Sequence, residues 1–311
     1  MRLVFLGTGA IARAHARRLG RHKGVELAFA SRTPERARAI ARSLGGASYP
    51  SYDAAITAPE VDVVAVVTPP DSHAELALRA LAAGKHVVLE KPALLRSADV
   101  ATVAAAAAAA NRRVFVAENY HYKPLLARLN RLLADRVVGD VLFIQVNAIK
   151  QQAAPGWRSG HGALYEGGIH WIDFMTKLGE VRGVRGHAPA PRPGATPAVE
   201  RSMLVTFDYA GGAVGTLAYS WEVPATARGL RLSKIYGRAG TITFETNGLW
   251  VLCHGTRTRL HVPGLRDLAG YRAMWADFVA AWRDDREPAM TLDHARRDLE
   301  LVEQAYRTAG S

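Results

Sequence analysis

The sequence predicts an α/β protein of two domains, a doubly wound parallel sheet followed by a domain built on a mostly antiparallel sheet. Three observations lead to this fold class. A chain of 311 residues with 49% apolar content is long enough to bury two cores. The first 118 residues alternate short apolar runs with helical segments, whereas later strands are separated by hairpin turns. We therefore expect domains at 1–120 and 121–311.

The elements of the first domain alternate between strand and helix. Their apolar runs do not alternate with polar residues, which is typical of parallel strands covered by helices on both faces. We expect strands in RLVFLG, VELAFAS, VDVVAVVTPP, HVVLE and VFVAEN, and helices in AIARAHARRL, PERARAIARSL, SHAELALRALAAG and the alanine-rich stretch ending at residue 110.

The second domain is expected to open with a helix near 124–136 and a strand at VLFIQVNAIKQ. The sequences GG at 211–212, GRAG at 237–240 and NG at 247–248 predict hairpin turns between antiparallel strands. A Pro- and Gly-rich stretch, 186–198, is expected to be a loop between strands. Two helices, about 267–285 and 292–308, should end the chain.

Composition excludes several classes of protein. No apolar stretch approaches the roughly 20 residues of a spanning helix, and MRLVFLGTGA favours a strand over a signal peptide, so we expect a cytoplasmic protein. The single cysteine, Cys253, excludes disulfides and cysteine-cluster metal sites, and we expect no metal. The net charge of +12 is spread along the chain without a nucleic-acid-binding motif, which favours a solvated basic face and anionic small ligands over nucleic acid.

The segment GTGAIA directly follows the first strand and opens a helix, giving the pattern G-x-G-x-x-A. Glycines allow the backbone to approach a pyrophosphate, and the helix N-terminus supplies amide donors. The pattern predicts a dinucleotide-binding turn made by the residues Gly7, Thr8, Gly9, Ala10, Ile11 and Ala12.

The end of the second strand indicates which dinucleotide binds. Ser31, Arg32 and Thr33 stand where NAD-binding proteins usually carry an acid for the ribose hydroxyls. Hydroxyl donors and a guanidinium, with Arg36 one turn later, suit a 2′-phosphate. The alternative is an ordinary polar turn before a helix that begins at Pro34. We expect NADP(H) to be favoured over NAD(H).

Two further residues stand where chemistry is expected. Lys91 follows the strand HVVLE, at the carboxyl edge where open α/β sheets bind ligands, although a lysine there can also be a solvated surface residue. His170 lies in the apolar segment GGIHWID, where the alternative is a buried core histidine with a satisfied hydrogen bond.

GTGAIA, VTPPDSHAELALRALAAGKHVVLEKP, AENYHYKP and GHGALYEGGIHWIDF together resemble the Gfo/Idh/MocA family, the relatives of glucose-fructose oxidoreductase and inositol dehydrogenase. The resemblance runs almost end to end. It implies a Rossmann domain, a second domain on an open antiparallel sheet, and cofactor contacts from Thr68, Pro69, His73, Glu90 and Lys91.

Family members commonly carry D-x-G-x-H-x-x-D, with a lysine, the first acid and the histidine forming the catalytic set. The resemblance assigns Lys91, Glu166 and His170 to this set, with Asp173 as the following acid. Glu166 departs from the pattern, since it is one methylene longer than aspartate. If the segment is helical, Glu166, His170 and Asp173 share one face, so that a carboxylate can fix the tautomer of His170. The two glycines before His170 would let a ligand approach the backbone.

The expected substrate is a sugar, cyclitol or similar polyol. By resemblance its pocket is lined by Tyr120, Tyr122, Lys150, Trp157, Arg158 and Asp173, with His121 beside them, although each could be ordinary loop or interface packing. Hydride would pass between nicotinamide and a carbinol or ketone carbon, His170 would exchange the hydroxyl proton, and Lys91 would stabilise charge on the same oxygen.

Two other functions stay open: a glycosidase that oxidises its sugar transiently with a tightly bound nicotinamide cofactor, and a non-catalytic cofactor-binding regulator. Retention of the lysine, acid and histidine argues against the regulator. An open sheet would expose a large apolar face, so we expect a homodimer or homotetramer.

Overall fold

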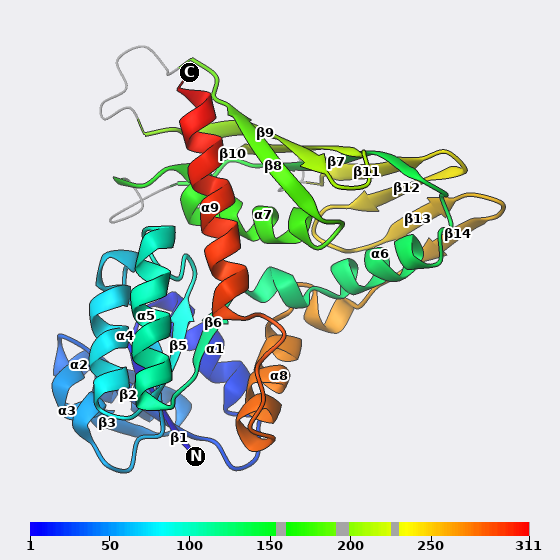
Figure 1. Ribbon diagram of the computed structural model, residues 1–311. Coiled ribbons are helices and arrows are strands. Elements are labelled where there is room, and N and C mark those ends of the chain that lie inside the picture. Colours follow the sequence, from blue (N-terminus) through cyan, green and yellow to red (C-terminus); the bar gives the residue numbers. More distant parts are fainter. Residues whose placement is uncertain (154–159, 191–198, 225–229, 311) are drawn as a thin grey trace. The chain divides into compact units, whose positions relative to one another are not determined.

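The computed structural model describes residues 1–153, 160–190, 199–224 and 230–310. The chain divides into two compact units (Figure 1). The first contains Met1–Glu118 and Tyr271–Arg297, and the second contains Asn119–Gly270 and Asp298–Ser311. A C-terminal segment thus belongs to the first unit, whereas the sequence suggested a single cut near residue 120.

The first unit is built on a parallel sheet, which in the described residues has six strands in the order β3-β2-β1-β4-β5-β6. The strands are β1 (Arg2–Leu6), β2 (Glu26–Ala30), β3 (Ala47–Tyr49), β4 (Val63–Val66), β5 (His86–Glu90) and β6 (Val114–Ala117). The helices are α1 (Ala10–Leu19), α2 (Pro34–Leu44), α3 (Tyr52–Thr57), α4 (His73–Ala82), α5 (Ser97–Ala110) and α8 (Tyr271–Arg283). The predicted doubly wound parallel sheet is confirmed.

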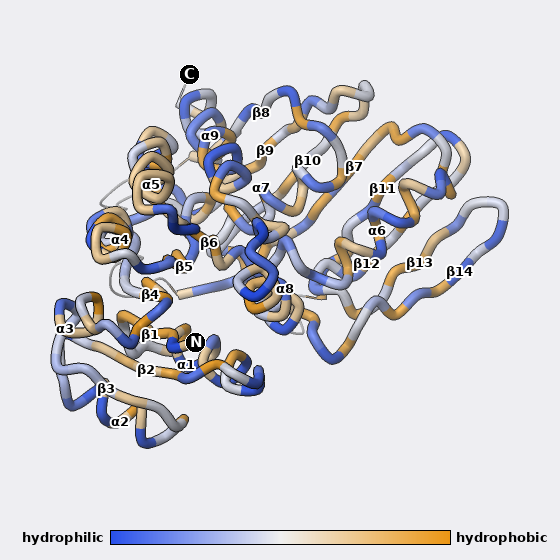
Figure 2. Tube along the Cα trace, turned by 60° about the horizontal axis from the view of Figure 1, so that its bottom comes forward, coloured by the Kyte–Doolittle hydropathy of each residue, from blue (hydrophilic) through white to orange (hydrophobic). Residues whose placement is uncertain are grey.

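The strand register places the ligand-binding edge. Leu6 pairs with Ala30 on one side and with Val66 on the other, so β1, β2 and β4 end at the same level. The central strands β1 and β4 are mostly hydrophobic (Figure 2) and almost entirely buried, as expected for strands covered on both faces. Their carboxyl ends therefore present the loops after Leu6, Ala30 and Val66 along one edge.

The helix α8 joins the first unit through an aromatic core. Trp275 and Phe278 are fully buried, and the Phe278 ring lies edge-on to Phe115 with the centroids 5.0 Å apart. Trp275 lies edge-on to Phe5, whose ring also stacks on Phe29. Burying such large aromatic surfaces is a sufficient reason for this segment to leave the second half of the sequence.

The second unit is built on a mixed, mostly antiparallel sheet, eight-stranded in the described part of the chain, with the order β14-β13-β12-β11-β7-β10-β9-β8. The strands are β7 (Val141–Ile149), β8 (Val181–His187), β9 (Ser202–Tyr209), β10 (Val214–Ser220), β11 (Leu232–Gly237), β12 (Gly240–Glu245), β13 (Val251–His254) and β14 (Thr258–His261). Only β7 and β10 pair in parallel among these described strands. The predicted fold class is confirmed here too.

Helices cover one face of this sheet. They are α6 (Pro124–Ala134), a π-helical turn η4 (Leu164–Gly168) and α7 (Ile169–Thr176), and the last helix, α9 (Leu292–Ala309), contributes its residues from Asp298 onward. Figure 1 shows α6 and α7 on the same side of the sheet. Tyr209 donates its hydroxyl hydrogen bond to the carbonyl of Met175, which fixes α7 on β9. The helix α9 runs along β8, where Gly186 N–H donates to Thr308 Oγ1 at 2.8 Å.

The hairpins lie where the glycines predicted them, between β9 and β10, β11 and β12, and β12 and β13. Gly212 and Gly248 have φ of +82° and +104°, which a side chain rarely tolerates. Of the predicted loop 186–198, residues 191–198 lie outside the described residues.

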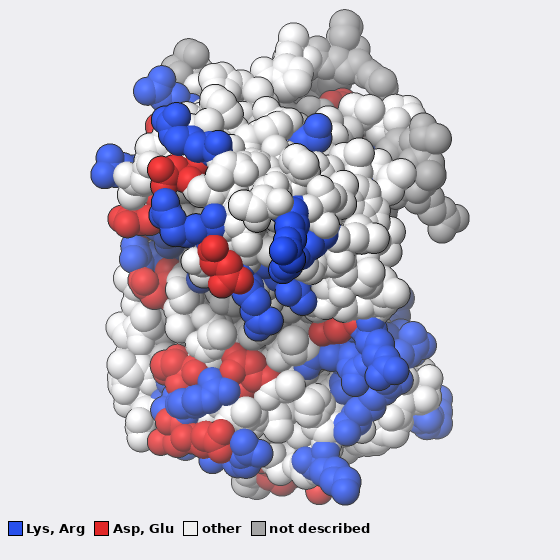
Figure 3. Space-filling view, turned by 90° about the vertical axis from the view of Figure 1, so that its right-hand side faces the viewer, with Lys and Arg blue, Asp and Glu red and all other residues white. Residues whose placement is uncertain are grey.

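Several of the arginines form ion pairs with acidic side chains. Arg2 pairs with Glu26, Arg96 with Asp99, and Arg136 with Asp140. On the face drawn in Figure 3, Lys and Arg side chains lie in several groups with Asp and Glu beside them. In the described residues no helix is long and apolar enough to cross a membrane.

Candidate active site

The turn after β1 has the geometry that a dinucleotide requires. Gly7 has φ of +116°, and a Cβ on it would lie 3.0 Å from the carbonyl oxygen of Val67. A Cβ on Gly9 would meet no atom within 4 Å, so the backbone faces open space directly before α1. Ala12 is fully buried, as the third position of the motif needs for close packing of helix and strand. Residues 7–12 therefore fit a pyrophosphate at the start of α1.

The turn after β2 presents two arginines. The Oγ of the buried Ser31 accepts the Thr33 N–H at 3.2 Å, which shapes the turn, while Arg32 and Arg36 are exposed. Pro34 begins α2 as predicted. The nearest acid in sequence, Glu35, pairs with Arg38 one turn further along the helix.

The segment Glu90–Ala93 at the end of β5 is tied to the loop after β4 by His73. The His73 ring is 1% exposed; its Nε2 lies 2.9 Å from the carbonyl oxygen of Thr68, and its Nδ1 lies 3.1 Å from those of Pro92 and Ala93. Burial lowers the pKa of His73. The residue predicted to contact cofactor is thus a buried link between two loops, one of which carries the half-buried Lys91. Pro69 lies in the other loop, directly after Thr68.

The predicted histidine block is helical, as expected, but its first turn is a π-helix. Glu166 lies in η4 and is 3% exposed, whereas the half-buried His170 lies in the first turn of α7. Such π-helical turns are rare and often mark functional sites.

The glycines of this block are needed for packing. A Cβ on Gly167 would lie 2.2 Å from the hydroxyl oxygen of Tyr219, and one on Gly168 would lie 2.7 Å from Leu164. The Cβ directions of both glycines are filled by side chains of this chain, and the expectation that the glycines let a ligand approach the backbone stays a prediction. Trp221, directly after β10, donates its indole N–H to the Tyr219 hydroxyl. This hydrogen bond holds the hydroxyl next to Gly167 of η4.

Aromatic stacking fixes one face of His170. The Tyr120 ring lies 4.4 Å from the imidazole, centroid to centroid, at an interplanar angle of 16°. The Lys123 ammonium lies 4.4 Å from the Tyr120 ring centroid and donates to the carbonyl of Leu268. The short helix η2 (Asn119–Tyr122) after β6 therefore holds the imidazole plane in place.

A second histidine lies in the same cluster. His121 Nδ1 is 2.9 Å from Asp173 Oδ1, and both side chains are almost fully buried. Asp173 Oδ2 has no hydrogen-bond partner among the described residues. Asp173 thus pairs with His121, whereas the helical spacing alone had suggested a shared face with His170. The sequence offered both residues but no sign of their pairing, because they are 52 positions apart.

Four predicted substrate residues remain to be located. Tyr122 is half-buried beside His121, and Lys150 is half-buried directly after β7. Trp157 and Arg158 lie outside the described residues. Sequence reasoning missed Arg231, which is 9% exposed, donates to Asn247 Oδ1 and lies 5.9 Å from the Trp171 ring centroid.

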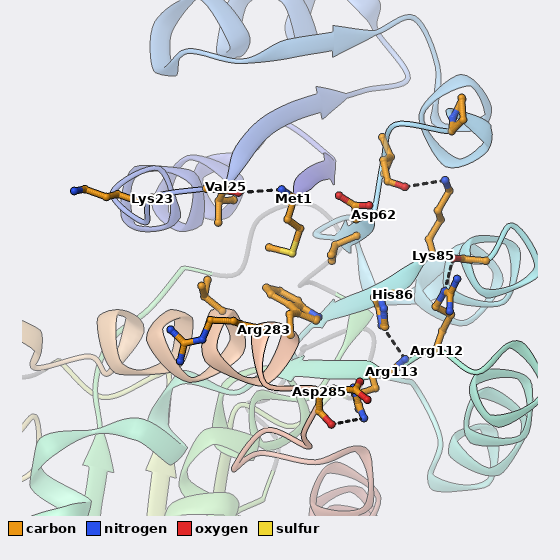
Figure 4. A pocket seen from close by; sticks show the side chains of 17 residues that line it. Met1, Lys23, Val25, Asp62, Lys85, His86, Arg112, Arg113, Arg283 and Asp285 are labelled. Atoms are coloured by element: carbon orange, nitrogen blue, oxygen red, sulfur yellow. Dashed lines mark hydrogen bonds and ion pairs between the residues drawn. The ribbon is translucent and has the colours of Figure 1, made fainter.

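The first unit also contains a cavity of about 760 Å³ at the opposite edge of its sheet (Figure 4). Its lining comes from the amino ends of the strands, including Met1, Asp62 and His86. Lys85 donates to the carbonyls of Ala58 and Val61, and Arg113 pairs with Asp285. Because ligands of such sheets bind at the carboxyl edge, this cavity is not the candidate site.

Comparison with known proteins gives the family. Residues 1–118 match the model of an oxidoreductase family with an NAD-binding Rossmann fold, and residues 126–243 match the GFO/IDH/MocA C-terminal domain. A putative UDP-kanosamine synthase oxidoreductase subunit of Amycolatopsis mediterranei is 31% identical over 297 residues, covering 83% of this chain and 81% of that protein. The chain belongs to the Gfo/Idh/MocA family.

Two further similar proteins are also named as oxidoreductases or dehydrogenases. Levoglucosan dehydrogenase of Pseudarthrobacter phenanthrenivorans is 28% identical, over 90% of this chain and 78% of that protein. The aldose-aldose oxidoreductase of Caulobacter crescentus, solved with glycerol, superposes with a TM-score of 0.88 at 23% identity, covering 100% of this chain and 97% of that one. The predictions of the family and of a nicotinamide-dependent oxidoreductase are confirmed.

Proposed function

We propose that this protein is an NADP(H)-dependent oxidoreductase that acts on a hydroxyl or keto carbon of a sugar, cyclitol or related polyol. The observation that carries the proposal is the retention of Lys91, Glu166 and His170 in a chain of this family. A protein that only senses a cofactor needs no proton-transfer residues. The named relatives act on sugars, which favours the same substrate class here.

Residues 7–12 would hold the dinucleotide, with Thr68, Pro69 and Glu90 near it. Bound nicotinamide supplies the hydride acceptor or donor. His170 would exchange the substrate hydroxyl proton, since an imidazole titrates near neutral pH and its ring is held by Tyr120. Lys91 would donate a hydrogen bond to the same oxygen and stabilise charge developing there. Glu166 would orient His170 or accept from a neighbouring hydroxyl.

Polar and aromatic side chains of the second unit would bind the sugar ring. We assign this role to Tyr120, Tyr122, Lys150, Trp157, Arg158 and Asp173. The buried pair of His121 and Asp173 supports it, because Asp173 retains an acceptor oxygen with no partner among the described residues. Such an oxygen costs free energy unless a donor reaches it.

The proposal is tested by removing the proton-transfer groups. Lys91→Met and His170→Ala should each lower turnover by about 10²–10⁴-fold, and His170→Ala should leave cofactor affinity unchanged, because His170 is not among the residues assigned to the cofactor. Turnover is followed as nicotinamide absorbance over a panel of sugars, keto-sugars and inositols. Lys23→Met and His187→Ala, both at exposed positions, are the matched controls.

Near-normal turnover in either variant would refute the assigned roles. Cleavage of glycosides without net change in free cofactor would instead support the glycosidase alternative.

A further inference from the structure

A chain of three buried side chains lies behind the Glu90–Lys91 turn of the first unit. Trp275 donates its indole N–H to His15 Nδ1 at 3.1 Å, and His15 Nε2 lies 3.1 Å from Glu90 Oε1. The exposed fractions of Trp275, His15 and Glu90 are 0%, 1% and 5%. The residues come from α8, α1 and β5, so three elements meet at one polar contact in an otherwise aromatic core.

These contacts fix the protonation of His15. An indole N–H can only donate, so Nδ1 must accept and carries no proton. A neutral imidazole then bears its single proton on Nε2, which donates to the Glu90 carboxylate. The hydrogen bond from Trp275 therefore keeps Nδ1 of His15 unprotonated, and the neutral ring then donates from Nε2 to Glu90. We call this arrangement a relay.

The ring of His15 cannot turn away from this arrangement. Tyr271 and Trp275 contact it edge-on, with ring centroids 5.2 and 5.5 Å from it, and Phe5 stacks against it. The Arg18 guanidinium in turn lies 4.7 Å from the Tyr271 ring centroid.

The turn that carries Lys91 is thus held at two points. His15 holds the Glu90 side chain, and His73 lies against the carbonyls of Pro92 and Ala93. Lys91 stands between them. A buried carboxylate that lost the hydrogen bond from His15 would carry an added desolvation cost and would shift toward its other contacts, moving the backbone that bears Lys91.

We propose that His15, held by Trp275, is a positioning residue that acts through Glu90 to place Lys91 for turnover. The proposal rests on the proposed function of Lys91. Its effect should appear in kcat more than in cofactor affinity, since His15 is enclosed in the core and is not among residues 7–12, which would hold the dinucleotide.

The kinetic test compares His15→Phe with His15→Gln. Phenylalanine keeps the aromatic packing but has no donor for Glu90, so kcat should fall by about 10- to 100-fold, KM should stay within about threefold, and the cofactor Kd should change less than kcat. Glutamine keeps an N–H donor near the position of Nε2, so kcat should return to within about fivefold of wild type. Ile40→Ala, a cavity in the same unit far from this turn in sequence, controls for lost stability.

A double-mutant cycle locates the effect. If His15 acts through Glu90, then adding His15→Phe to Glu90→Gln should lower kcat no further than the more damaging single change. Fully multiplicative losses would mean that His15 acts elsewhere, and would overturn the proposal.

A second measurement does not depend on turnover. In ¹⁵N NMR of the whole protein labelled at histidine rings, the His15 signal, assigned by its loss in His15→Phe or His15→Gln, should show a protonated Nε2 and an unprotonated Nδ1. Trp275→Phe removes the N–H that keeps Nδ1 unprotonated, so protonation at Nδ1 should become detectable beside the protonated Nε2. A doubly protonated ring, or a proton on Nδ1 in the wild type, would overturn the relay even if His15→Phe fails to fold.

The outcomes separate this inference from the proposed function. An active wild type with an inactive Lys91→Met and a normal His15→Phe would sink the positioning role alone. A wild type that oxidises or reduces no polyol would remove the proposed function, and the positioning role with it.

Discussion

At the scale of single residues, the cofactor preference depends on Arg32. It follows β2 at the edge where the ribose is bound in such folds, and no carboxylate stands at positions 31–33 to repel a phosphate. An exposed guanidinium at this turn, with Arg36 on the next turn, can form bidentate hydrogen bonds to a dianion.

Arg32→Gln should therefore weaken NADPH binding by about 10- to 100-fold, since charge-assisted hydrogen bonds to a phosphate are worth a few kcal/mol, and leave NADH binding within about twofold. Fluorescence titration of both cofactors measures the effect. Arg38→Gln is the matched control, because Arg38 lies on α2, the helix that follows this turn, but pairs with Glu35. Equal wild-type affinities for NADPH and NADH, or unchanged NADPH binding in Arg32→Gln, would defeat the preference.

Single residues also show where sequence reasoning stops. The roles of Gly7 in a tight turn and of Pro34 at the start of α2 depend on local backbone conformation, so both could be predicted from the neighbouring sequence. The contacts of His15 with Glu90 and Trp275 span 75 and 260 positions. Burial of His15 and His73 depends on which elements pack together, and no local pattern carries that information.

At the scale of elements, the start of η4 depends on the half-buried carboxylate of Glu200. Glu200 Oε1 accepts the Leu164 N–H at 2.7 Å, and Oε2 accepts from the Tyr306 hydroxyl at 3.0 Å. Tyr306 in turn accepts the Tyr165 N–H. The turn that carries Glu166 is thus anchored to the segment before β9 and to α9.

Burial raises the pKa of Glu200 to about 7. The folded protein therefore binds this proton more tightly than the unfolded chain, whose carboxyl titrates near 4.3. The resulting stability is complete below about pH 4 and is lost as the pH rises through about 7, a loss on the order of 3 kcal/mol. Within the pH range 5 to 8, the wild type should become less stable as pH increases.

Glu200→Gln should remove most of that slope, because an amide keeps the acceptor for Leu164 and cannot ionise. Denaturant unfolding at several pH values measures the difference between the two proteins, and Glu180→Gln, at an exposed position, is the control. Parallel slopes in the wild type and Glu200→Gln would show that Glu200 does not titrate in this range.

The elements that sequence analysis missed share a cause. The strand β3 has three residues on the edge of the sheet, and α3 has six, so neither contains an apolar run long enough to recognise. The π-helical turn η4 was also not predicted, since an extra residue in a helix leaves no mark in an apolar pattern. Most of the longer strands and helices were predicted because their apolar residues repeat, but β8 was not, since VRGVRGH contains only two apolar side chains.

At the scale of the whole molecule, the sequence gives no reason for α8 to join the first unit. Its apolar stripe predicts a helix with one buried face but not the sheet on which it packs. The pairing of Trp275 and Phe278 with Phe5 and Phe115 supplies the reason. A segment near the C-terminus can therefore belong to the N-terminal unit when its aromatic side chains complete the core of that unit.

The sheet of the second unit exposes apolar side chains on one face. Phe143 is 51% exposed and lies opposite Val214, and Leu252 lies opposite Leu260, which is 66% exposed. Cross-strand partners point to the same side of a sheet, so these exposed side chains share a face. They do so in the described residues together with Leu204 and Leu232.

Extended apolar faces of this kind usually mark an interface, and a symmetric pair of copies can bury the same face twice. We therefore expect the wild type to have a mass two or four times that of the 33.6 kDa chain in light scattering. Phe143→Glu should shift it toward the monomer, because a charge buried in an interface without a partner is costly. Leu265→Glu, at a residue that is 62% exposed but lies outside the sheet strands, should leave the mass unchanged. A monomeric wild type would mean that this face remains in contact with water.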